Sequence, residues 1–243
     1  MNQPGPAGQS TAGARLAGRP QARRALPADP PPADPVLYAM ACGSPVAGHV
    51  HELVAAAQRA GWHVRVIATP QGRAFLDVAA LAAQTGHEVR SDFCHAAEGE
   101  TLPAADAIVV APATVNTVNK WAHGIADTLV LALLIEAYGM GVPVVVVPYT
   151  NAAMAVHPAF QQSLHTLRSW GVRVLFGEDV VAMPQKGEAA RRAAEFPWHL
   201  ALAALGPPGR AHRTPPARRG MAGRRRPAPP AMPRPAPSIV WTR

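Results

Sequence analysis

Cysteine is scarce in this chain of 243 residues, which contains only Cys42 and Cys94. Two cysteines cannot build the multi-bridge framework of small secreted domains, and their spacing is not that of a zinc site. The sequence therefore predicts no metal centre. A reducing compartment is the simplest interpretation, so we expect a cytoplasmic protein.

Long apolar runs are also missing. No run reaches the roughly 20 apolar residues that a membrane-spanning helix needs. The first residues have no apolar stretch of the secretory type, since Arg23-Arg24 is followed by Ala-Leu-Pro-Ala-Asp-Pro. We therefore expect a soluble protein without a membrane partner.

Acidic residues are absent from Gly206 onward, where nine Arg and ten Pro occur. The formal net charge of +8 comes from the two ends, because residues 36–205 carry a net charge of −3. Pro- and Arg-rich composition cannot bury enough apolar surface to offset the entropy of ordering. Residues 1–35 and 206–243 are therefore predicted to be disordered tails flanking one domain. Nucleic-acid binding through the basic tail is an alternative function, but no aromatic residues alternate with the arginines to stack on bases.

Between the tails, apolar runs of strand length alternate with helical patterns. This alternation predicts a three-layer, doubly wound α/β fold with a mostly parallel sheet of flavodoxin or Rossmann type. The expected strands are 36–42, 63–69, 107–111, 142–148 and 172–176, with a short possible strand at 88–93. The expected helices are 46–60, 72–85, 118–138, 160–170 and 188–205, the last interrupted near Pro197. In the second helix we expect core positions at Phe75, Val78, Ala79 and Ala82.

The stretch from Val109 to Asp127, VVAPATVNTVNKWAHGIAD, organises the rest of the chain. Pro112 is expected to end its β-branched run, because proline lacks a backbone donor. In a parallel sheet, a strand end followed by a helix start offers free N–H groups and partial positive charge to an anion or a carbonyl edge. An ordinary helix cap without a ligand is the alternative. The candidate binding residues are Pro112, Ala113, Thr114, Asn116 and Thr117.

Two more strand ends carry small or polar residues. Gly43 and Ser44 follow the first expected strand, and Thr69 ends the second. A turn of small residues lets backbone N–H groups approach a phosphate. Many such turns bind nothing, so these residues alone leave the ligand open.

The central stretch resembles the signature of the flavin-mononucleotide-binding cysteine decarboxylase family, which includes phosphopantothenoylcysteine decarboxylase and the lantibiotic-peptide decarboxylases. That signature reads P-A-[ST]-A-N-T, then K, then G-[IL]-A-D, and here Val115 replaces a small residue. The turn at Gly43 is similar to the family's G-S-x-A, and Thr69 with Phe75 to its T-x-x-A-x-x-F segment. The resemblance implies FMN as cofactor, held by Gly43, Ser44, Thr69, Pro112, Ala113, Thr114, Asn116 and Thr117.

A second motif follows the run 142–148. P-Y-T-N-A-A-M, then H-P, resembles the family's P-x-M-N-x-x-M-W-x-x-P, with Thr150 in place of Met and Ala155 in place of Trp. The resemblance implies that Asn151 contacts the substrate carboxylate beside Met154, and it makes His95 the candidate active-site histidine. Asn151 could instead satisfy its own turn, and a lone loop histidine is usually solvated.

The chain lacks one part of the family pattern, the Cys- and Gly-rich flap, since no cysteine follows Cys94. We therefore expect an FMN-binding flavoprotein that acts on a small carboxylate-bearing compound, without efficient decarboxylation of phosphopantothenoylcysteine. A non-catalytic flavin-binding or regulatory protein is the alternative. The family's assemblies imply a homo-oligomer, a trimer or a multiple of trimers.

Overall fold

A computed structural model of the chain describes residues 35–93 and 102–208, which lie in the larger of its two compact units, Pro32–Arg243. The predicted tails therefore lie almost wholly outside the described residues, and their disorder and the boundaries at 35 and 206 stay predictions.

The elements in chain order are β1 (Val36–Ala41), η1 (Pro45–His49), α1 (Val50–Arg59), β2 (His63–Ala68), α2 (Pro70–Arg73), α3 (Val78–Thr85), β3 (Ala107–Ala113), α4 (Val115–Ala122), α5 (Leu129–Met140), β4 (Val144–Pro148), α6 (Ala152–Ala155), α7 (Pro158–Ser169), β5 (Arg173–Val174), η2 (Ala193–Glu195) and α8 (Trp198–Leu205).

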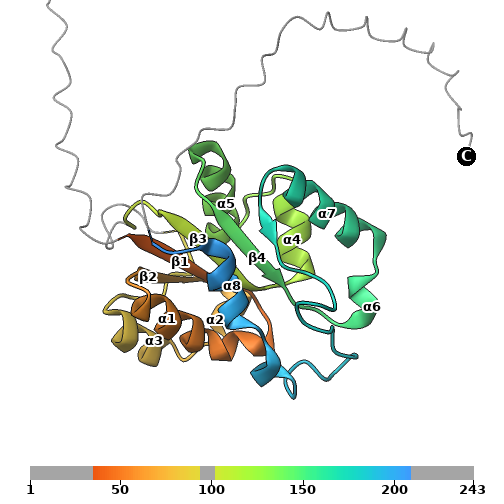
Figure 1. Cartoon of the computed structure of the whole chain (residues 1–243), viewed down its shortest axis with the longest axis horizontal. Coiled ribbons are helices and arrows are strands. Elements are labelled where there is room, and N and C mark those ends of the chain that lie inside the picture. The colour runs from red at the N-terminus through yellow and green to blue at the C-terminus, as the bar shows by residue number, and fades with distance from the viewer. Residues whose placement is uncertain (1–34, 94–101, 209–243) are drawn as a thin grey trace, which may run out of the picture. The chain divides into compact units, whose positions relative to one another are not determined.

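Five parallel strands form one sheet in the order β2-β1-β3-β4-β5 (Figure 1). Leu37 of β1 pairs with Val64 of β2 on one side and with Ala107 of β3 on the other. The strand order reverses between β1 and β3, as in doubly wound folds of flavodoxin type. The predicted fold class is confirmed.

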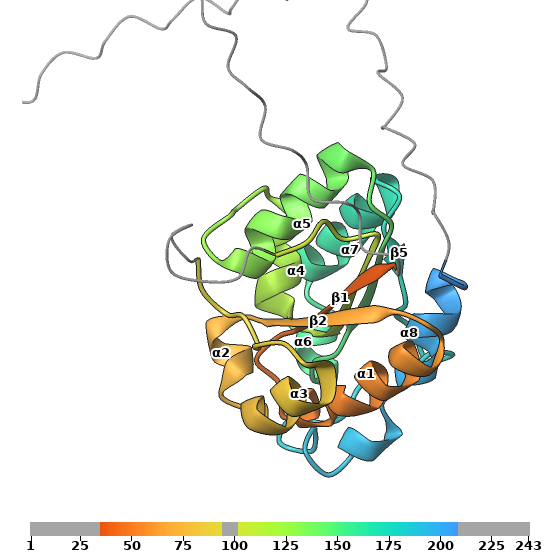
Figure 2. The ribbon, with the colours of Figure 1, turned by 90° about the vertical axis from the view of Figure 1, so that its left-hand side faces the viewer.

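Helices cover both faces of the sheet (Figure 2). On one face, α1, α3 and α8 pack on a core that contains Val109 and Val147. On the other face, α4, α5 and α7 pack on a core that contains Val110 and Val146. Every residue of β1, β3 and β4 is buried, because neither face of these strands meets water. Continuous apolar runs, rather than alternating ones, follow from that position.

The predicted helix 72–85 is two helices. Asp77 caps α3, since its Oδ1 accepts the backbone N–H of Ala80 at 2.9 Å. The new start changes the phase of the helix, so Leu81 is the residue that faces the core. Phe75 is 43% exposed and Ala79 is exposed. The prediction that these two side chains are buried was wrong.

The prediction that Pro112 ends its strand was also wrong, because β3 continues to Ala113. The pairing of β3 with β4 shifts register between Val110 and Ala113, so the ladder does not need the missing N–H of proline. The carbonyl oxygen of Pro112 accepts the N–H of Cys42 at 3.1 Å, which joins the ends of β3 and β1. This contact fixes the two strand ends that flank the reversal of the sheet.

The predicted helix 118–138 is also divided. Gly124, with φ of +70°, follows the end of α4, and α5 begins again at Leu129. The break leaves Ile125 43% exposed.

The short strand that was possible at 88–93 is reduced to a single bridge between Arg90 and Ile67. The helix expected at 188–205 is regular only from Trp198 onward. Pro197 stands directly before this regular part, and proline has no backbone N–H to donate to a preceding turn. Within 35–93 and 102–208, no helix is long and apolar enough to span a bilayer.

Candidate functional site

A cavity of about 350 Å³ opens at the carboxyl ends of β1, β2 and β3. The crevice is a consequence of topology, because α1 follows β1 on one face of the sheet and α4 follows β3 on the other. Its size is within the range of small-molecule sites. The lining residues are Gly43, Thr69, Pro70, Gln71, Thr114, Asn116, Thr117, Lys120, Thr128 and Leu131.

Three threonine N-caps converge on this cavity. The Oγ1 atoms of Thr69, Thr114 and Thr128 accept the N–H groups of Gly72 at 3.0 Å, Thr117 at 3.4 Å and Leu131 at 3.4 Å. Each cap begins a helix, α2, α4 or α5, so three helix starts meet at one place. Helix starts present unpaired N–H groups and partial positive charge. The wall therefore favours an anionic or carbonyl-bearing ligand.

Two glycines allow α2 to pack directly against the end of β1. A Cβ at Gly72 would lie 2.4 Å from the carbonyl oxygen of Ala41, closer than atoms can approach. A Cβ at Gly43 would lie 2.8 Å from Cβ of Gln71. The absence of side chains at both positions therefore places Gln71 on the cavity wall beside Gly43.

Lys120 is the only charged side chain among the ten lining residues. Its Nζ lies 2.5 Å from Oδ2 of Asp127, in the loop between α4 and α5. Both side chains remain partly accessible, at 31% for Lys120 and 48% for Asp127. The pair joins the last turn of α4 to the residues just before α5.

Cys42 lies beneath the cavity and is fully buried. Its thiol hydrogen-bonds with the side chain of Thr117 and the backbone of Thr114. Burial raises the pKa of the Cys42 thiol, and these two hydrogen bonds only partly oppose that rise. The thiol is therefore neutral at physiological pH, and its position is that of a supporting residue rather than a nucleophile.

Five of the eight predicted cofactor residues line this cavity, namely Gly43, Thr69, Thr114, Asn116 and Thr117. Ser44, Pro112 and Ala113 do not line it. Ser44 is 6% exposed and its carbonyl oxygen accepts the N–H of Ala47 at 2.9 Å, while Pro112 and Ala113 are buried in β3. These three residues shape the backbone around the cavity, and their contacts with a cofactor stay predictions.

The residues predicted to bind substrate lie at the next strand end, outside the cavity lining. Oδ1 of Asn151 accepts the N–H of Met154 at 2.9 Å and so caps α6. Met154 is 48% exposed. The turn interpretation of Asn151 thus describes its amide oxygen, and its role toward a substrate stays a prediction. His95 lies outside the described residues.

The sequence interpretation missed five lining residues, Pro70, Gln71, Lys120, Thr128 and Leu131. Thr128 could have been found, because a threonine directly before the apolar run of α5 is an N-cap signal. Lys120 stands inside the quoted motif without an assigned role. Gln71 and Leu131 carry no local signal, because they reach the cavity only through the packing of α2 and α5.

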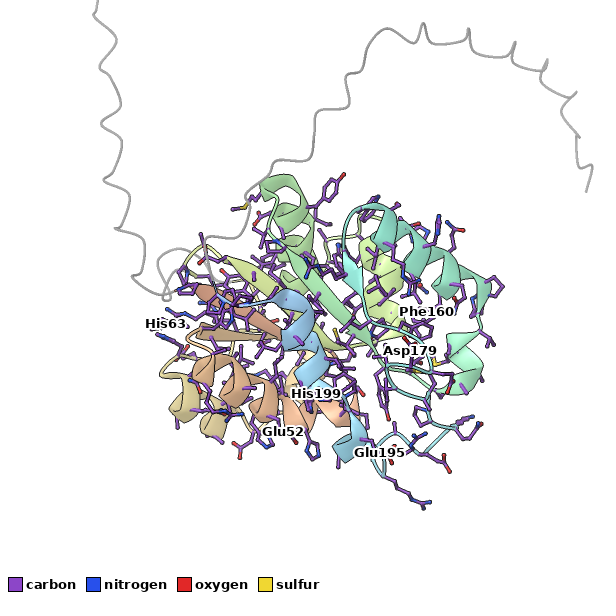
Figure 3. The ribbon with its side chains drawn as sticks, in the orientation of Figure 1. Glu52, His63, Phe160, Asp179, Glu195 and His199 are labelled. Atoms are coloured by element: carbon purple, nitrogen blue, oxygen red, sulfur yellow. The ribbon has the colours of Figure 1, made fainter. Side chains whose placement is uncertain are left out.

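A larger hollow, of about 740 Å³, lies between α1 and α8, and it illustrates why volume alone does not select the site. It mixes charges of both signs, including Glu52, Arg59 and Glu195, with the aromatic rings of Phe196 and Trp198. Figure 3 labels Glu52 on α1, Glu195 on η2 and His199 on α8. None of the predicted site residues lines it.

Comparison with known proteins identifies relatives of this chain. The chain is 33% identical over 115 residues to the coenzyme A biosynthesis bifunctional protein CoaBC of Bacillus subtilis, covering 45% of this chain and 28% of that protein. The chain thus matches little more than a quarter of that relative's length.

Solved structures match more of their length. The FMN-dependent cysteine decarboxylase SpaF is 29% identical with a TM-score of 0.53, covering 67% of this chain and 98% of SpaF. TvaF, an FMN-dependent cysteine decarboxylase from thioviridamide biosynthesis, is 28% identical with a TM-score of 0.51, covering 65% of this chain and 98% of TvaF. These matches confirm the predicted resemblance.

The model of the Flavoprotein family matches residues 34–195, which is more than half of the chain and includes every cavity-lining residue. The chain therefore belongs to the Flavoprotein family.

Proposed function

We propose that this chain binds FMN in the cavity at the reversal point between β1 and β3. The observation that supports this most directly is the convergence of three threonine-capped helix starts on one cavity of about 350 Å³. Doubly wound sheets of this strand order bind ligands in that crevice. FMN combines an anionic phosphate with a ring edge of alternating donors and acceptors, and the lining offers matching groups for both.

The lining divides by chemistry. Gly43 and Thr69 form a compact part where backbone N–H groups and a hydroxyl suit a phosphate. Asn116 adds an amide that can donate and accept at a ring edge, and Leu131 adds an apolar surface for the ring, whereas Gln71 lies beside Gly43. Bound FMN would supply reversible two-electron oxidation and reduction, and these residues would bind and orient it.

We further propose that the protein acts as an enzyme on a small carboxylate-bearing compound, as its decarboxylase relatives suggest. Asn151 is the candidate for binding the carboxylate. Its capping bond to Met154 uses the amide oxygen. The amide N–H groups would then donate hydrogen bonds to the carboxylate. We do not expect efficient decarboxylation of phosphopantothenoylcysteine itself, because no cysteine follows Cys94.

A non-catalytic flavin-binding role is the second candidate, and one observation favours it. The segment after β5 packs onto the protein body, where the carbonyl oxygen of Pro184 accepts the N–H of Ala152 at 2.9 Å. Met183 packs against the core, and residues 175–208 contain no cysteine. The part of the chain that corresponds to the decarboxylase flap thus offers no thiol for acid–base work.

An absorption spectrum of the purified protein, recorded after addition of FMN and removal of the unbound flavin, tests the proposal. Bound oxidised flavin absorbs at about 450 nm, and its binding is expected at one FMN per chain. A protein that leaves FMN free in equilibrium dialysis would overturn the proposed function. Release of carbon dioxide from phosphopantothenoylcysteine by the loaded protein would contradict the narrower statement about substrate.

We also propose a homo-oligomer, with three copies or a multiple of three, in the cytoplasm. Four large apolar side chains are exposed, Phe75 at 43%, Ile125 at 43%, Met154 at 48% and Val156 at 74%. Exposed apolar surface is typical of protein–protein contacts when it forms a contiguous patch. Light scattering of the full chain, together with FMN, measures the copy number, and a monomer at all concentrations would contradict this.

A further inference from the structure

Lys120 lines the cavity from α4, which follows β3, whereas Gly43 lines it just after β1. Lys120 follows Asn116 by one turn of α4, so both side chains project from the same face of the helix, about 6 Å apart along its axis. Thr128 and Leu131 of α5 line the same cavity. The ammonium group of Lys120 is therefore placed beside the region that we assign to the ring.

The pairing of Lys120 decides which part of a flavin it suits. Asp127 holds the ammonium at 2.5 Å, so the pair carries no net charge. A carboxylate so close would repel a phosphate dianion. A ring that gains negative charge only on reduction is a better partner, because it needs a nearby cation of moderate strength.

We propose that Lys120 raises the reduction potential of the flavin ring, and that Asp127 both positions this cation and attenuates its charge. This inference rests on the proposed binding of FMN. A positive charge near the pyrimidine edge of the ring stabilises the reduced flavin more than the oxidised one. By linkage, the same charge strengthens the binding of reduced FMN relative to oxidised FMN.

Two single variants distinguish this electrostatic role from a structural one. Lys120→Met removes the cation and leaves the carboxylate of Asp127, so the midpoint potential of bound FMN should fall. Asp127→Asn removes the anion and leaves the cation, so the potential should rise. The double variant restores the net charge of the native pair and should lie between the two. Lys120→Arg keeps the charge and should return the potential close to the native value.

The measurement is the midpoint potential of FMN bound to the full chain, obtained by reductive titration with a reference dye at low and high salt. The two shifts should have opposite signs and shrink as salt increases, because screening weakens partly exposed charges. If the pair only braces the loop between α4 and α5, both single variants lose the same contact and shift the potential in the same direction or not at all. Either result would overturn the inference.

Failure of the inference can be separated from failure of the proposed function. A native chain that binds no FMN refutes the function, whereas a chain that binds FMN with potentials unchanged in both variants refutes only the role of Lys120. Circular dichroism of each variant checks the fold. A variant that retains little FMN is tested instead by its affinities for oxidised and reduced FMN. The affinity for reduced FMN divided by that for oxidised FMN should fall for Lys120→Met and rise for Asp127→Asn.

Discussion

The ends of β3 and β4 are built from the same local parts. Each strand passes into a helix through a polar N-cap, Thr114 before α4 and Asn151 before α6. Of these two strand ends, only that of β3 opens onto the cavity at the sheet reversal. The neighbour of β3 on that side is β1, whose helix lies on the opposite face, whereas the helices after β3 and β4 lie on the same face. A polar N-cap therefore makes a binding site only where the topology leaves a crevice.

The C-terminal part of the chain adds to this difference. Pro184 accepts a backbone hydrogen bond from Ala152, so the segment after β5 lies against the start of α6. Tyr149, just after β4, is 2% exposed and packs edge-on against Phe196 at 5.4 Å between ring centroids. Desolvation by that burial raises the pKa of Tyr149. The C-terminal segment thus buries Tyr149 directly after β4, whereas the end of β3 opens onto the cavity.

The largest expected effect comes from exchanging an amide for an apolar group at the two ends. Asn116→Leu removes a hydrogen-bonding group from the cavity wall and adds bulk there, so FMN affinity should fall about 10- to 100-fold. Asn151→Leu makes the same change outside the cavity lining and should leave FMN affinity near the native value. Fluorescence titration with FMN measures both. Equal losses in the two variants would contradict the assignment of the site to the β3 end.

A smaller effect is expected where α2 packs on β1. Gly72→Ala places a Cβ 2.4 Å from the carbonyl oxygen of Ala41 and 3.0 Å from Oγ1 of Thr69. The unfolding free energy should fall by about 1–3 kcal/mol, and FMN affinity should fall with it because the cap of Thr69 is displaced.

The matched control is Gly139→Ala in α5, where nothing lies within 4 Å of the added Cβ. That variant should gain about 0.5–1 kcal/mol, because alanine loses less backbone entropy in a helix. Chemical denaturation measures both free energies. A Gly72→Ala protein as stable as the Gly139→Ala protein would show that the close approach of α2 is not required.

Removal of the cap at the β4 end should affect stability without affecting the cofactor. Asn151→Ala removes the acceptor for the N–H of Met154, which should lower the unfolding free energy by about 1 kcal/mol. The number of FMN molecules bound per chain should stay the same. Loss of FMN from a variant whose apo form remains folded would show that the ends of β3 and β4 both belong to the flavin site.

The smallest effect concerns the thiol below the cavity. Burial raises the pKa of Cys42 above the value of an unfolded cysteine, so its contribution to stability is fully present at neutral pH and is lost as the pH rises through the ordinary thiol range. The native protein should therefore lose more unfolding free energy between pH 7.5 and pH 10, values that bracket a thiol pKa of about 8.5, than Cys42→Ala does. Denaturation at both pH values measures the difference. Parallel losses would show that the thiol ionises equally in both states.

The sequence by itself determined the elements whose causes are local. All five predicted strands are present, the last of them shortened to Arg173–Val174. The continuous apolar runs of β1, β3 and β4 suit positions buried on both faces. The caps at Thr69 and Thr114 are local as well, since each hydroxyl accepts an N–H three residues later. These caps sit at strand ends, so the sequence indicated which turns could face a ligand.

Only the tertiary structure decided which of those turns share a cavity and what completes it. Phe75 was expected in the core, but the new helix start at Asp77 turned the phase and left the ring exposed. Gln71 and Leu131 reach the cavity through the close packing of α2 on β1 and the position of α5 beside α4. Asn151 has the same local chemistry as Thr114 but lies outside the cavity lining. Such outcomes depend on contacts between residues distant in sequence, and no local pattern of side chains encodes them.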